Sequence, residues 1–288
     1  MPLEKWLETA QRIAEEAGAL LESAFRQDQE LSVEHKGAID LVTPFDRESE
    51  ALIRRRLVEE GMAGKPGLPS MVLEEGSLGD RIESEWVWFC DPLDGTTNFA
   101  HRHFAFAVSI GLARMGETGY YEPVMGVVNA PAMGITWMGG VGMGAIRIQG
   151  GRSVPIRVSK VDRLEEALLA TGFPYDIRVN PRNNIAEHAT LLLKAQGVRR
   201  MGSAAIDLCL LAQGSHDGYW EHRLGPWDIV GGAAIAIAGG AKVSNHSGQP
   251  MNPLDGEILA TNGRLHRAMI EALALARTKK IDWSLYFP

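Results

Sequence analysis

The sequence contains few cysteines and no apolar run long enough to cross a membrane. Its 288 residues include 2 cysteines, Cys90 and Cys209, which lack the C-x-x-C spacing of zinc and redox sites. We therefore expect packed free thiols and no disulfide framework. The longest uncharged runs, 104–113 and 229–241, are much shorter than the roughly 20 residues of a membrane-spanning helix. Because no apolar signal segment follows Met1, we expect a cytoplasmic protein without a membrane partner.

Positive charge is also scarce. Lysine and arginine number 29 against 36 aspartates and glutamates, which gives a net charge of −7. Such a surface repels nucleic acids, and the short basic runs at 54–56, 199–200 and 279–280 are typical of solvated or locally ion-paired faces. We therefore expect no nucleic acid as a main partner. With 45% hydrophobic and 23% charged residues, the chain can form an ordinary buried core, which excludes a disordered protein.

The first half of the chain predicts helices followed by strands. Apolar residues recur every three or four positions over 3–25, which predicts an amphipathic helix. Thr43–Pro44 is typical of a helix start, and Gly61 of its end. Short apolar runs at 71–73 and 86–90 predict strands, and each stops at acidic residues.

The second half alternates helices and strands. This change in the order of the predicted elements predicts two units, 1–150 (α+β) and 151–288 (α/β). Asp228 opens a further helix behind a proline and a tryptophan. The predicted helices lie at 163–170, 184–196, 203–213 and 264–276, and the predicted strands lie around 168–172, 217–220 and 256–261.

The densest chemical signal is a short motif that follows the strand at 86–90. Asp91, the carbonyl of Leu93 and Asp94 can aim oxygen ligands at hard cations. Gly95 gives the backbone conformational freedom at this turn. Thr96–Thr97 offer hydroxyl and N–H groups at a helix N-terminus that suits phosphate. Divalent cations would invert the sign of this acidic site, so the motif indicates metal-assisted transfer of a phosphoryl group to water. The alternative is a solvated, N-capped turn without chemistry.

These motifs resemble those of the inositol monophosphatase family, within the fructose-bisphosphatase-like superfamily of metal-dependent, lithium-sensitive phosphatases. The resemblance implies a mixed α+β and α/β fold, a layered α-β-α-β-α sandwich of the inositol monophosphatase and fructose-1,6-bisphosphatase type, and usually a homodimer. The segments that carry it are Lys36–Gly37, Asp40–Thr43 with Asp46, Glu74–Glu75, Asp91–Phe99 with His101, Val108–Ile110, Thr171–Asp176, Gly202–Ala205, Asp217–Glu221 and Trp227–Asp228.

The resemblance also implies two to three Mg²⁺ ions per site. The first is bound by Glu74, Asp91 and the Leu93 carbonyl; the second by Asp91, Asp94 and Asp228; and a third, weaker ion by Glu74 and water. Most of these ligands lie in the unit 1–150, and the unit 151–288 completes the site and the substrate pocket.

The catalytic residues that the resemblance implies are Asp46 and Thr96, which orient and deprotonate the attacking water, together with Glu74. Phosphate oxygens are held by the backbone N–H groups of Gly95 and Thr96. The polyol is bound by Asp94, by the main-chain N–H of Ala205 and by the carboxylate of Glu221.

We therefore expect a phosphatase that hydrolyses myo-inositol monophosphates to inositol and phosphate. The alternative substrates are fructose 1,6-bisphosphate, 3′-phosphoadenosine 5′-phosphate or NADP, histidinol phosphate and glycerol phosphate. An alternative of another class is a non-catalytic, regulatory protein-binding module, because a fold does not by itself prove an activity.

Overall fold

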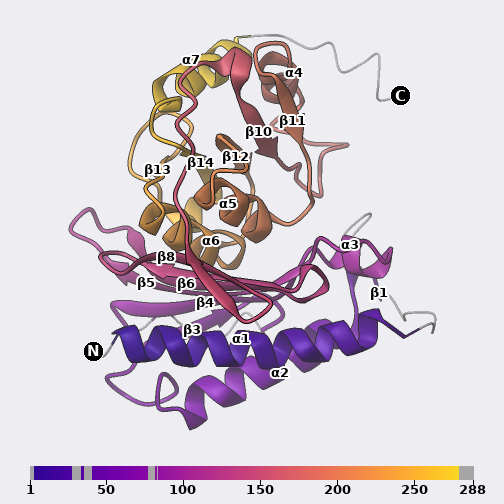
Figure 1. Cartoon of the computed structure of the whole chain (residues 1–288), viewed down its shortest axis with the longest axis vertical. Helices are drawn as coiled ribbons and strands as arrows, with labels where there is room; N and C mark the ends of the chain where they lie inside the picture. Colours follow the sequence, from indigo (N-terminus) through magenta and orange to yellow (C-terminus); the bar gives the residue numbers. More distant parts are fainter. Residues whose placement is uncertain (1–2, 28–33, 36–40, 77–81, 83, 279–288) are drawn as a thin grey trace.

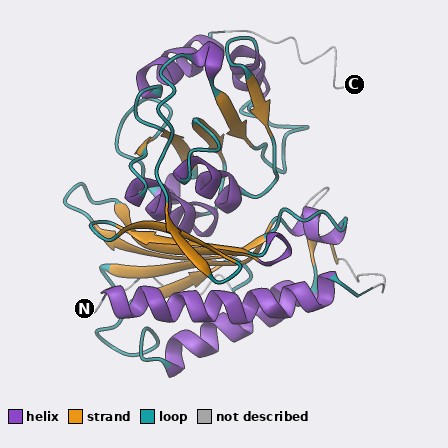
Figure 2. Cartoon of the chain, viewed as in Figure 1, coloured by secondary structure: helices purple, strands orange, loops and turns teal. Residues whose placement is uncertain are grey.

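The computed structural model describes residues 3–27, 34–35, 41–76, 82 and 84–278. Helices and sheets alternate in layers (Figures 1 and 2): a helix pair, a sheet, a second helix pair, a second sheet and a third helix pair. This arrangement confirms the predicted α-β-α-β-α sandwich. The resemblance residues Lys36, Gly37 and Asp40, and the basic pair at 279–280, lie outside the described residues.

The two N-terminal helices begin and end as the sequence predicts. Helix α1 spans Leu3–Phe25 and α2 spans Pro44–Glu59. The N-cap Thr43 accepts a hydrogen bond from the backbone N–H of Phe45 at 3.2 Å, and the Asp46 side chain accepts one from the N–H of Thr43 at 2.8 Å. This reciprocal cap holds Asp46 in the first turn of α2.

The larger sheet has 7 strands in sequential order. Its first two strands are parallel, and the other neighbours are antiparallel. The strands are β3 (Ser70–Leu73), β4 (Trp86–Asp94), β5 (Ala107–Met115), β6 (Tyr121–Ala130), β7 (Ile135–Gly140), β8 (Gly144–Gln149) and β9 (Arg152–Pro155). A small pair of strands, β1 (Glu34–His35) and β2 (Leu41–Val42), lies apart from this sheet.

The strand predicted at 86–90 is longer than the sequence indicates. β4 continues to Asp94, and its pairing with β5 shifts register between Asp91 and Asp94, while Asp91 still pairs with Ser109. Pro92 has no N–H to donate, so the ladder is interrupted there by a bulge instead of ending. The prediction that the strand stops before Asp91 is therefore wrong, because the acidic motif lies in an irregular strand end.

The smaller sheet has 5 strands in the order β11-β10-β12-β14-β13. Helices α5 and α6 pack between the two sheets, while α4 and α7 contact each other on the outer side of the smaller sheet (Figure 1). The elements are β10 (Leu168–Thr171), α4 (Ile185–Leu192), β11 (Gly197–Arg199), α5 (Ala204–Ala212), β12 (Gly218–His222), α6 (Pro226–Ala238), β13 (Lys242–Ser244), β14 (Glu257–Thr261) and α7 (His266–Arg277).

The helix predicted at 163–170 is wrong, whereas the strand predicted around 168–172 is confirmed. Leu164–Glu166 form one 3-10 turn, and Leu168–Thr171 form β10, which is hydrogen-bonded to a strand on each side. Short apolar runs that are covered on both faces have no periodicity that separates a strand from a helix, so tertiary pairing decides. The helix predicted at 184–196 is present but ends earlier, at Leu192.

Apolar clusters fill the space between the layers. Cys90 lies in the cluster beneath α1 and α2, and Cys209 in the cluster between the larger sheet and helices α5 and α6, and both thiols are free. Arg54, Arg55 and Arg56 form local ion pairs with neighbouring glutamates, as predicted. Within the described ranges, no helix combines the length and apolar character needed to cross a bilayer.

Helix α6 lies unusually close to the larger sheet, because glycines face each other across the contact. A Cβ atom on Gly126 of β6 would lie 2.1 Å from the Gly231 carbonyl oxygen of α6, and one on Gly111 of β5 would lie 2.4 Å from the Gly231 nitrogen. A Cβ on Gly231 would lie 2.4 Å from the hydroxyl oxygen of Ser109, which pairs with Asp91. This contact brings the start of α6 against the acidic end of β4.

We expect Gly126→Ala to lower the free energy of unfolding by about 1–3 kcal/mol, because the added methyl meets backbone and the helix must move. Gly197→Ala is the matched control, since its methyl meets the ends of flexible side chains, and it should cost less than about 0.5 kcal/mol. Urea denaturation measures both. Equal stability of the two variants would contradict the close contact.

Candidate active site

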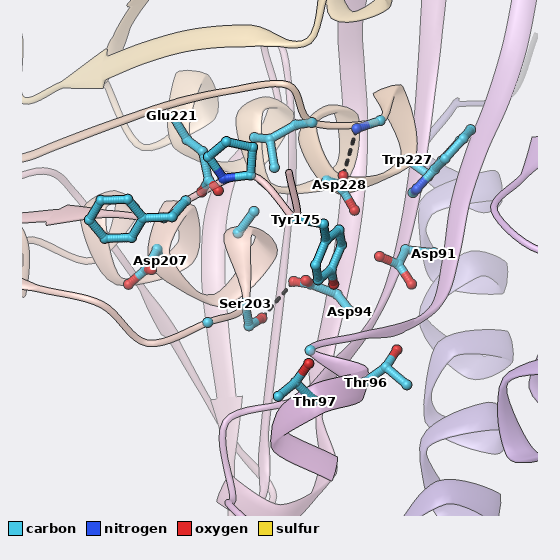
Figure 3. A pocket seen from close by; sticks show the side chains of 18 of the residues that line it. Asp91, Asp94, Thr96, Thr97, Tyr175, Ser203, Asp207, Glu221, Trp227 and Asp228 are labelled. Atoms are coloured by element: carbon cyan, nitrogen blue, oxygen red, sulfur yellow. Dashed lines mark hydrogen bonds between the residues drawn. The ribbon is translucent and has the colours of Figure 1, made fainter. Parts of the chain in front are cut away.

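One pocket collects side chains from both halves of the chain (Figure 3). The end of β4 and the start of α3 (Thr96–Ala100) form one side, and α5, β12 and the start of α6 form the other. The residues that line it are Glu74, Asp91, Leu93–Thr97, Gly172–Tyr175, Arg200, Gly202–Ala204, Asp207, Glu221, Arg223–Gly225, Trp227 and Asp228.

Three carboxylates meet on one side of this pocket. Asp91 and Asp94 belong to the end of β4, and Asp228 lies in the first turn of α6. One oxygen from each lies within 4.8 Å of the others, and Figure 3 shows the three groups around a common space. Asp228 also accepts a hydrogen bond from the Gly225 N–H at 2.7 Å. The same side chain therefore caps its helix and joins the cluster.

The electrostatics of this cluster fit a divalent cation. Burial raises the pKa of Asp91 well above its usual range, and repulsion from Glu74, Asp94 and Asp228 adds to the effect. Burial, followed by repulsion from Asp228, raises the pKa of Asp94 to about 7. Neighbouring buried carboxylates oppose each other's ionisation, and a cation removes that repulsion. Oxygen donors of this kind suit Mg²⁺, Mn²⁺ or Ca²⁺.

Glu74 and Leu93 lie beside the cluster. Glu74 directly follows β3, which runs parallel to β4, and its N–H donates to the Cys90 carbonyl at 3.3 Å. Both Glu74 and Leu93 line the pocket. The Leu93 N–H donates to Asp91 Oδ1 at 2.9 Å, which holds the turn closed around the carboxylate. The structure thus brings together all five proposed metal ligands.

Asp46 and Thr96 form a hydrogen-bonded pair next to the cluster. The Thr96 hydroxyl proton can reach Asp46 Oδ1 at 3.0 Å or the Leu93 carbonyl at 3.1 Å. The other Asp46 oxygen accepts from the hydroxyl of Thr43 at 2.6 Å. Burial raises the pKa of Asp46, and the hydrogen bonds from Thr43 and Thr96 oppose that rise. Thr96 lines the pocket, whereas Asp46 lies behind it.

Gly95 makes the turn from β4 into α3. Its φ of +91° belongs to the left-handed region that favours glycine. An added Cβ would lie 2.9 Å from the Ala105 carbonyl oxygen and 3.2 Å from that of Gly202. The helix start at Thr96, as predicted, places Gly95, Thr96 and Thr97 on the pocket wall. First-turn N–H groups of this kind suit an anionic oxygen.

Glu221 lies at the opposite end of the pocket from Asp91 (Figure 3). It belongs to β12, and the Tyr219 hydroxyl donates a short hydrogen bond to its Oε2. Burial raises the pKa of Glu221 to about 8, opposed by the Tyr219 hydrogen bond and reinforced by Asp228. A Cβ on Gly172 would lie 2.2 Å from both carboxylate oxygens, so a larger residue there would displace the Glu221 carboxylate.

The main-chain N–H of Ala205 has a different partner from the predicted polyol. It donates to Asp94 Oδ2 at 2.8 Å, and Ala205 is buried and does not line the pocket. The Ser203 hydroxyl donates to the same oxygen at 2.5 Å. The start of α5 therefore orients Asp94, and the contact of the Ala205 N–H with a polyol stays a prediction.

Sequence reasoning assigned no role to several pocket residues, among them Ser203, Asp207, Arg200, Tyr175 and Trp227. Ser203 shows the signal of an N-cap, because a hydroxyl precedes an apolar helix, and its oxygen accepts from the Ile206 N–H at 3.3 Å. Asp207 is the one charged residue within α5 (Ala204–Ala212), which is a signal that the sequence offers directly. The others carry no comparable pattern.

Comparison with known proteins gives a family match over most of the chain. A family model described as the inositol monophosphatase family matches residues 2–278. An inositol-1-monophosphatase of Synechocystis is 39% identical over 94% of this chain and 90% of the relative. A protein named putative Nus factor SuhB, from Neisseria meningitidis serogroup B, is 33% identical over 93% of this chain and 98% of the relative.

A solved structure shares the fold. The structure of inositol monophosphatase from Anabaena (Nostoc) has a TM-score of 0.81 with this chain and is 39% identical to it. The match covers 96% of this chain and 97% of that one. The layered architecture described above is therefore also present in that structure.

The raised pKa of Glu221 predicts that the stability of the metal-free protein depends on pH. Its pKa is about 8 in the folded state against 4.5 ordinarily, so the folded state keeps a proton that the unfolded chain has lost. Stability from this group therefore falls as pH rises through that window. In the presence of a chelator, the free energy of unfolding of Glu221→Gln should rise relative to that of the parent by up to about 4 kcal/mol as the pH increases from about 5 to about 8.

Urea denaturation at several pH values measures this difference. The surface variant Glu271→Gln is the control, because Glu271 is exposed and pairs only with Arg267 in the described chain, and its difference from the parent should stay flat. A flat curve for Glu221→Gln as well would contradict the raised pKa of Glu221.

Proposed function

The chain belongs to the inositol monophosphatase family, and we propose that it is a Mg²⁺-dependent phosphomonoesterase that hydrolyses myo-inositol monophosphates to inositol and phosphate. The observation that carries the proposal is the meeting of the Asp91, Asp94 and Asp228 carboxylates beside the hydrogen-bonded Asp46 and Thr96. Hard-cation ligands next to a carboxylate–hydroxyl pair are what hydrolysis of a phosphate ester by water requires.

In this proposal two groups of residues hold the cations. Glu74, Asp91 and the Leu93 carbonyl would hold one ion, Asp91, Asp94 and Asp228 a second, and Glu74 with water a third. Bound divalent cations supply a Lewis acid that polarises the phosphate, lowers the pKa of water and neutralises negative charge. Ser203 and the N–H of Ala205 keep one Asp94 oxygen engaged, which leaves the other oxygen for the cation.

Asp46 and Thr96 would accept the proton of the attacking water. When the Thr96 hydroxyl donates to Asp46 Oδ1, its oxygen lone pairs face away from that carboxylate and can accept a proton from water. The hydroxyl proton then passes to Asp46. The raised pKa of Asp46, caused by burial, makes this carboxylate a better proton acceptor than an exposed aspartate.

The two ends of the pocket would bind different parts of the substrate. The N–H groups of Gly95 and Thr96 would hold phosphate oxygens at the metal end. Glu221 and Asp94 would accept hydrogen bonds from polyol hydroxyls. A site built to pair hydroxyls discriminates against an alcohol that lacks them, because its buried polar groups are then left unpaired.

Two other functions compete with this proposal. The metal end recognises phosphate, so esters of fructose, nucleotides, histidinol or glycerol remain alternative substrates. The relatives named Nus factor SuhB raise the alternative of a regulatory, non-catalytic function. A chain with that function alone would be expected to have lost a metal-binding or catalytic residue. The residues whose loss would mark it are all present: Asp46, Glu74, Asp91, Asp94, Thr96 and Asp228. The intact set favours catalysis.

The first test measures phosphate release from inositol 1-phosphate, fructose 1,6-bisphosphate and 3′-phosphoadenosine 5′-phosphate, with Mg²⁺ and with EDTA. We expect the inositol ester to be hydrolysed best and only with Mg²⁺. Asp94→Asn should reduce turnover at least about 100-fold, because loss of a residue that only supports a ligand already costs metal sites about 10–100-fold.

The surface variant Asp162→Asn is the matched control and should retain full turnover. Mg²⁺ should raise the Tm of the parent and of this control, but not that of Asp94→Asn. Preference for another ester would replace the substrate and keep the mechanism. A Tm rise with Mg²⁺ but no hydrolysis would favour the regulatory function.

Thr96→Val and Asp46→Asn test the proton transfer. Each should lower kcat by about 100- to 10,000-fold, because the water loses its proton acceptor. The rise in Tm with Mg²⁺ should remain, since neither residue is a proposed ligand. Thr96→Ser keeps the hydroxyl and should keep most of the activity. Full activity of Thr96→Val would refute the role of the hydroxyl.

A further inference from the structure

Asn184 is a buried asparagine behind the pocket wall to which the proposed function gives no role. It is the N-cap residue of α4, yet its side chain makes no capping hydrogen bond, although asparagine at this position ordinarily makes one. Its φ of +67° lies in the left-handed region, which asparagine adopts more readily than most residues with a side chain. A buried amide in a left-handed backbone costs free energy, so its other contacts must offset that cost.

The amide of Asn184 uses both of its N–H groups and its oxygen. Nδ2 donates to Thr171 Oγ1 at 2.7 Å and to the Gly172 carbonyl at 2.6 Å. Oδ1 accepts from the indole N–H of Trp220 at 2.7 Å. Because an indole N–H only donates and a main-chain carbonyl only accepts, this orientation of the amide is the one that satisfies its partners. The Thr171 hydroxyl in turn donates to the Trp220 carbonyl at 2.6 Å.

This network surrounds the backbone next to Glu221. Thr171 and Trp220 are register partners in the parallel ladder of β10 and β12, and the residues that follow them are Gly172 and Glu221. A Cβ on Gly172 would meet both oxygens of the Glu221 carboxylate, so that carboxylate lies directly against the Gly172 main chain. Side chains alternate between the two faces of a strand, so Asn184 binds Trp220 on the face of β12 opposite to Glu221.

The strand pairing ends at the point where the Asn184 amide binds. β10 ends at Thr171, whereas β12 continues to His222, so the Gly172 main chain has left the strand while Glu221 still belongs to one. Asn184 gives the Gly172 carbonyl a donor at this point. The segment 172–175 lines the pocket. The amide therefore fixes the place at which this part of the pocket wall begins.

We propose that Asn184 is a positioning residue for substrate recognition, which fixes Gly172 and Trp220 so that the Glu221 carboxylate is held where a substrate hydroxyl can reach it. This inference rests on the proposed phosphatase function and extends it. Within the described part of the chain, no hydrogen bond of this network reaches the three clustered carboxylates at the other end of the pocket. Loss of the amide therefore weakens binding of the polyol and leaves the reaction at the phosphate unchanged.

The test compares myo-inositol 1-phosphate with 4-nitrophenyl phosphate, whose leaving group has no hydroxyl beyond the ester oxygen. Asn184→Asp tolerates the same backbone, but its carboxylate cannot donate to the Gly172 carbonyl. It should raise KM for the inositol ester about 10-fold, the low end of the loss for a hydrogen bond to a charged group, because Glu221 is displaced and not removed. Its kcat for that ester, and kcat/KM for the nitrophenyl ester, should change less than about threefold.

Asn184→Gly is the second variant, because glycine adopts the left-handed backbone and removes all three hydrogen bonds of the side chain. It should show a larger rise in KM with the same substrate dependence. If Asn184→Asp does not fold, Asn184→Gly decides by the ratio of the two kcat/KM values.

Asn262→Asp is the matched control. Asn262 is a buried asparagine whose Nδ2 also donates to a hydroxyl and to a carbonyl, those of Ser159 at 2.9 Å and Val161 at 2.7 Å. It does not line the pocket. The control should lower Tm, as Asn184→Asp does, but leave the ratio of the two kcat/KM values unchanged.

The outcomes separate this inference from the function on which it rests. Equal losses for both esters in the Asn184 variants would refute the inference and leave the phosphatase function standing. A parent that hydrolyses only the nitrophenyl ester would refute the inference and the proposed substrate. Failure of the parent to hydrolyse either ester with Mg²⁺ would overturn both proposals.

Variants of the residues through which Asn184 acts complete the test. Thr171→Ser keeps the hydroxyl of the network and should keep the ratio of the parent, whereas Thr171→Val should shift the ratio in the same direction as Asn184→Asp. Because Asn184 acts through Glu221, adding Asn184→Asp to Glu221→Ala should cause little further loss of kcat/KM for the inositol ester. Additive losses would show that Asn184 acts independently of Glu221 and would refute the positioning role.

Discussion

The close contact between α6 and the larger sheet is the constraint on which the site depends. Gly231 of the helix packs directly on Gly111 and Gly126 of neighbouring strands, with no Cβ atom between the backbones. Asp228 lies one turn before Gly231, and Asp91 pairs with Ser109 at the same contact. A larger residue at any of the three glycines would push the helix outward and separate the carboxylates.

This contact alone would place like charges together in a buried space, which is unfavourable. The structure offsets the repulsion by gathering the N-terminal ends of several helices around the site. Asp46 lies in the first turn of α2 and Asp228 in that of α6, while Ser203 caps α5 and Gly95 precedes α3. Helix N-termini carry partial positive charge and free N–H donors, so they favour carboxylates and anionic ligands.

The end of the pocket at which Glu221 lies is built differently. Glu221 and Asp207 come from a strand and a helix of the second half, and burial raises the pKa of both. Helix α3 and the end of β4, by contrast, present threonines and backbone N–H groups to the pocket. One end thus suits an anion with its cations, and the other suits neutral hydroxyls. The proposed substrate, a phosphate ester of a polyol, has both chemistries in one molecule.

Local patterns were enough to predict the parts of this protein that depend on local chemistry. The hydroxyl and proline at 43–44 predicted the start of α2, and the acidic motif at 91–96 supplied proposed metal ligands, Asp91 and Asp94, that the structure brings together with Asp228. The resemblance supplied Asp228 and Glu221, which no local pattern connects to that motif. Periodicity failed at 163–170, where pairing with two strands overrides a helical pattern.

Only the tertiary structure decided which partner each polar group has. The N–H of Ala205 donates to Asp94, and the Asp207 oxygen that has no hydrogen-bond partner among the described residues faces His216. These outcomes depend on distances between segments about a hundred residues apart in the chain, as between Asp94 and Ser203. Sequence determines which groups exist and which elements they join, whereas packing determines which donors meet which acceptors, because hydrogen bonds and charge repulsion act over only a few ångströms in a buried site.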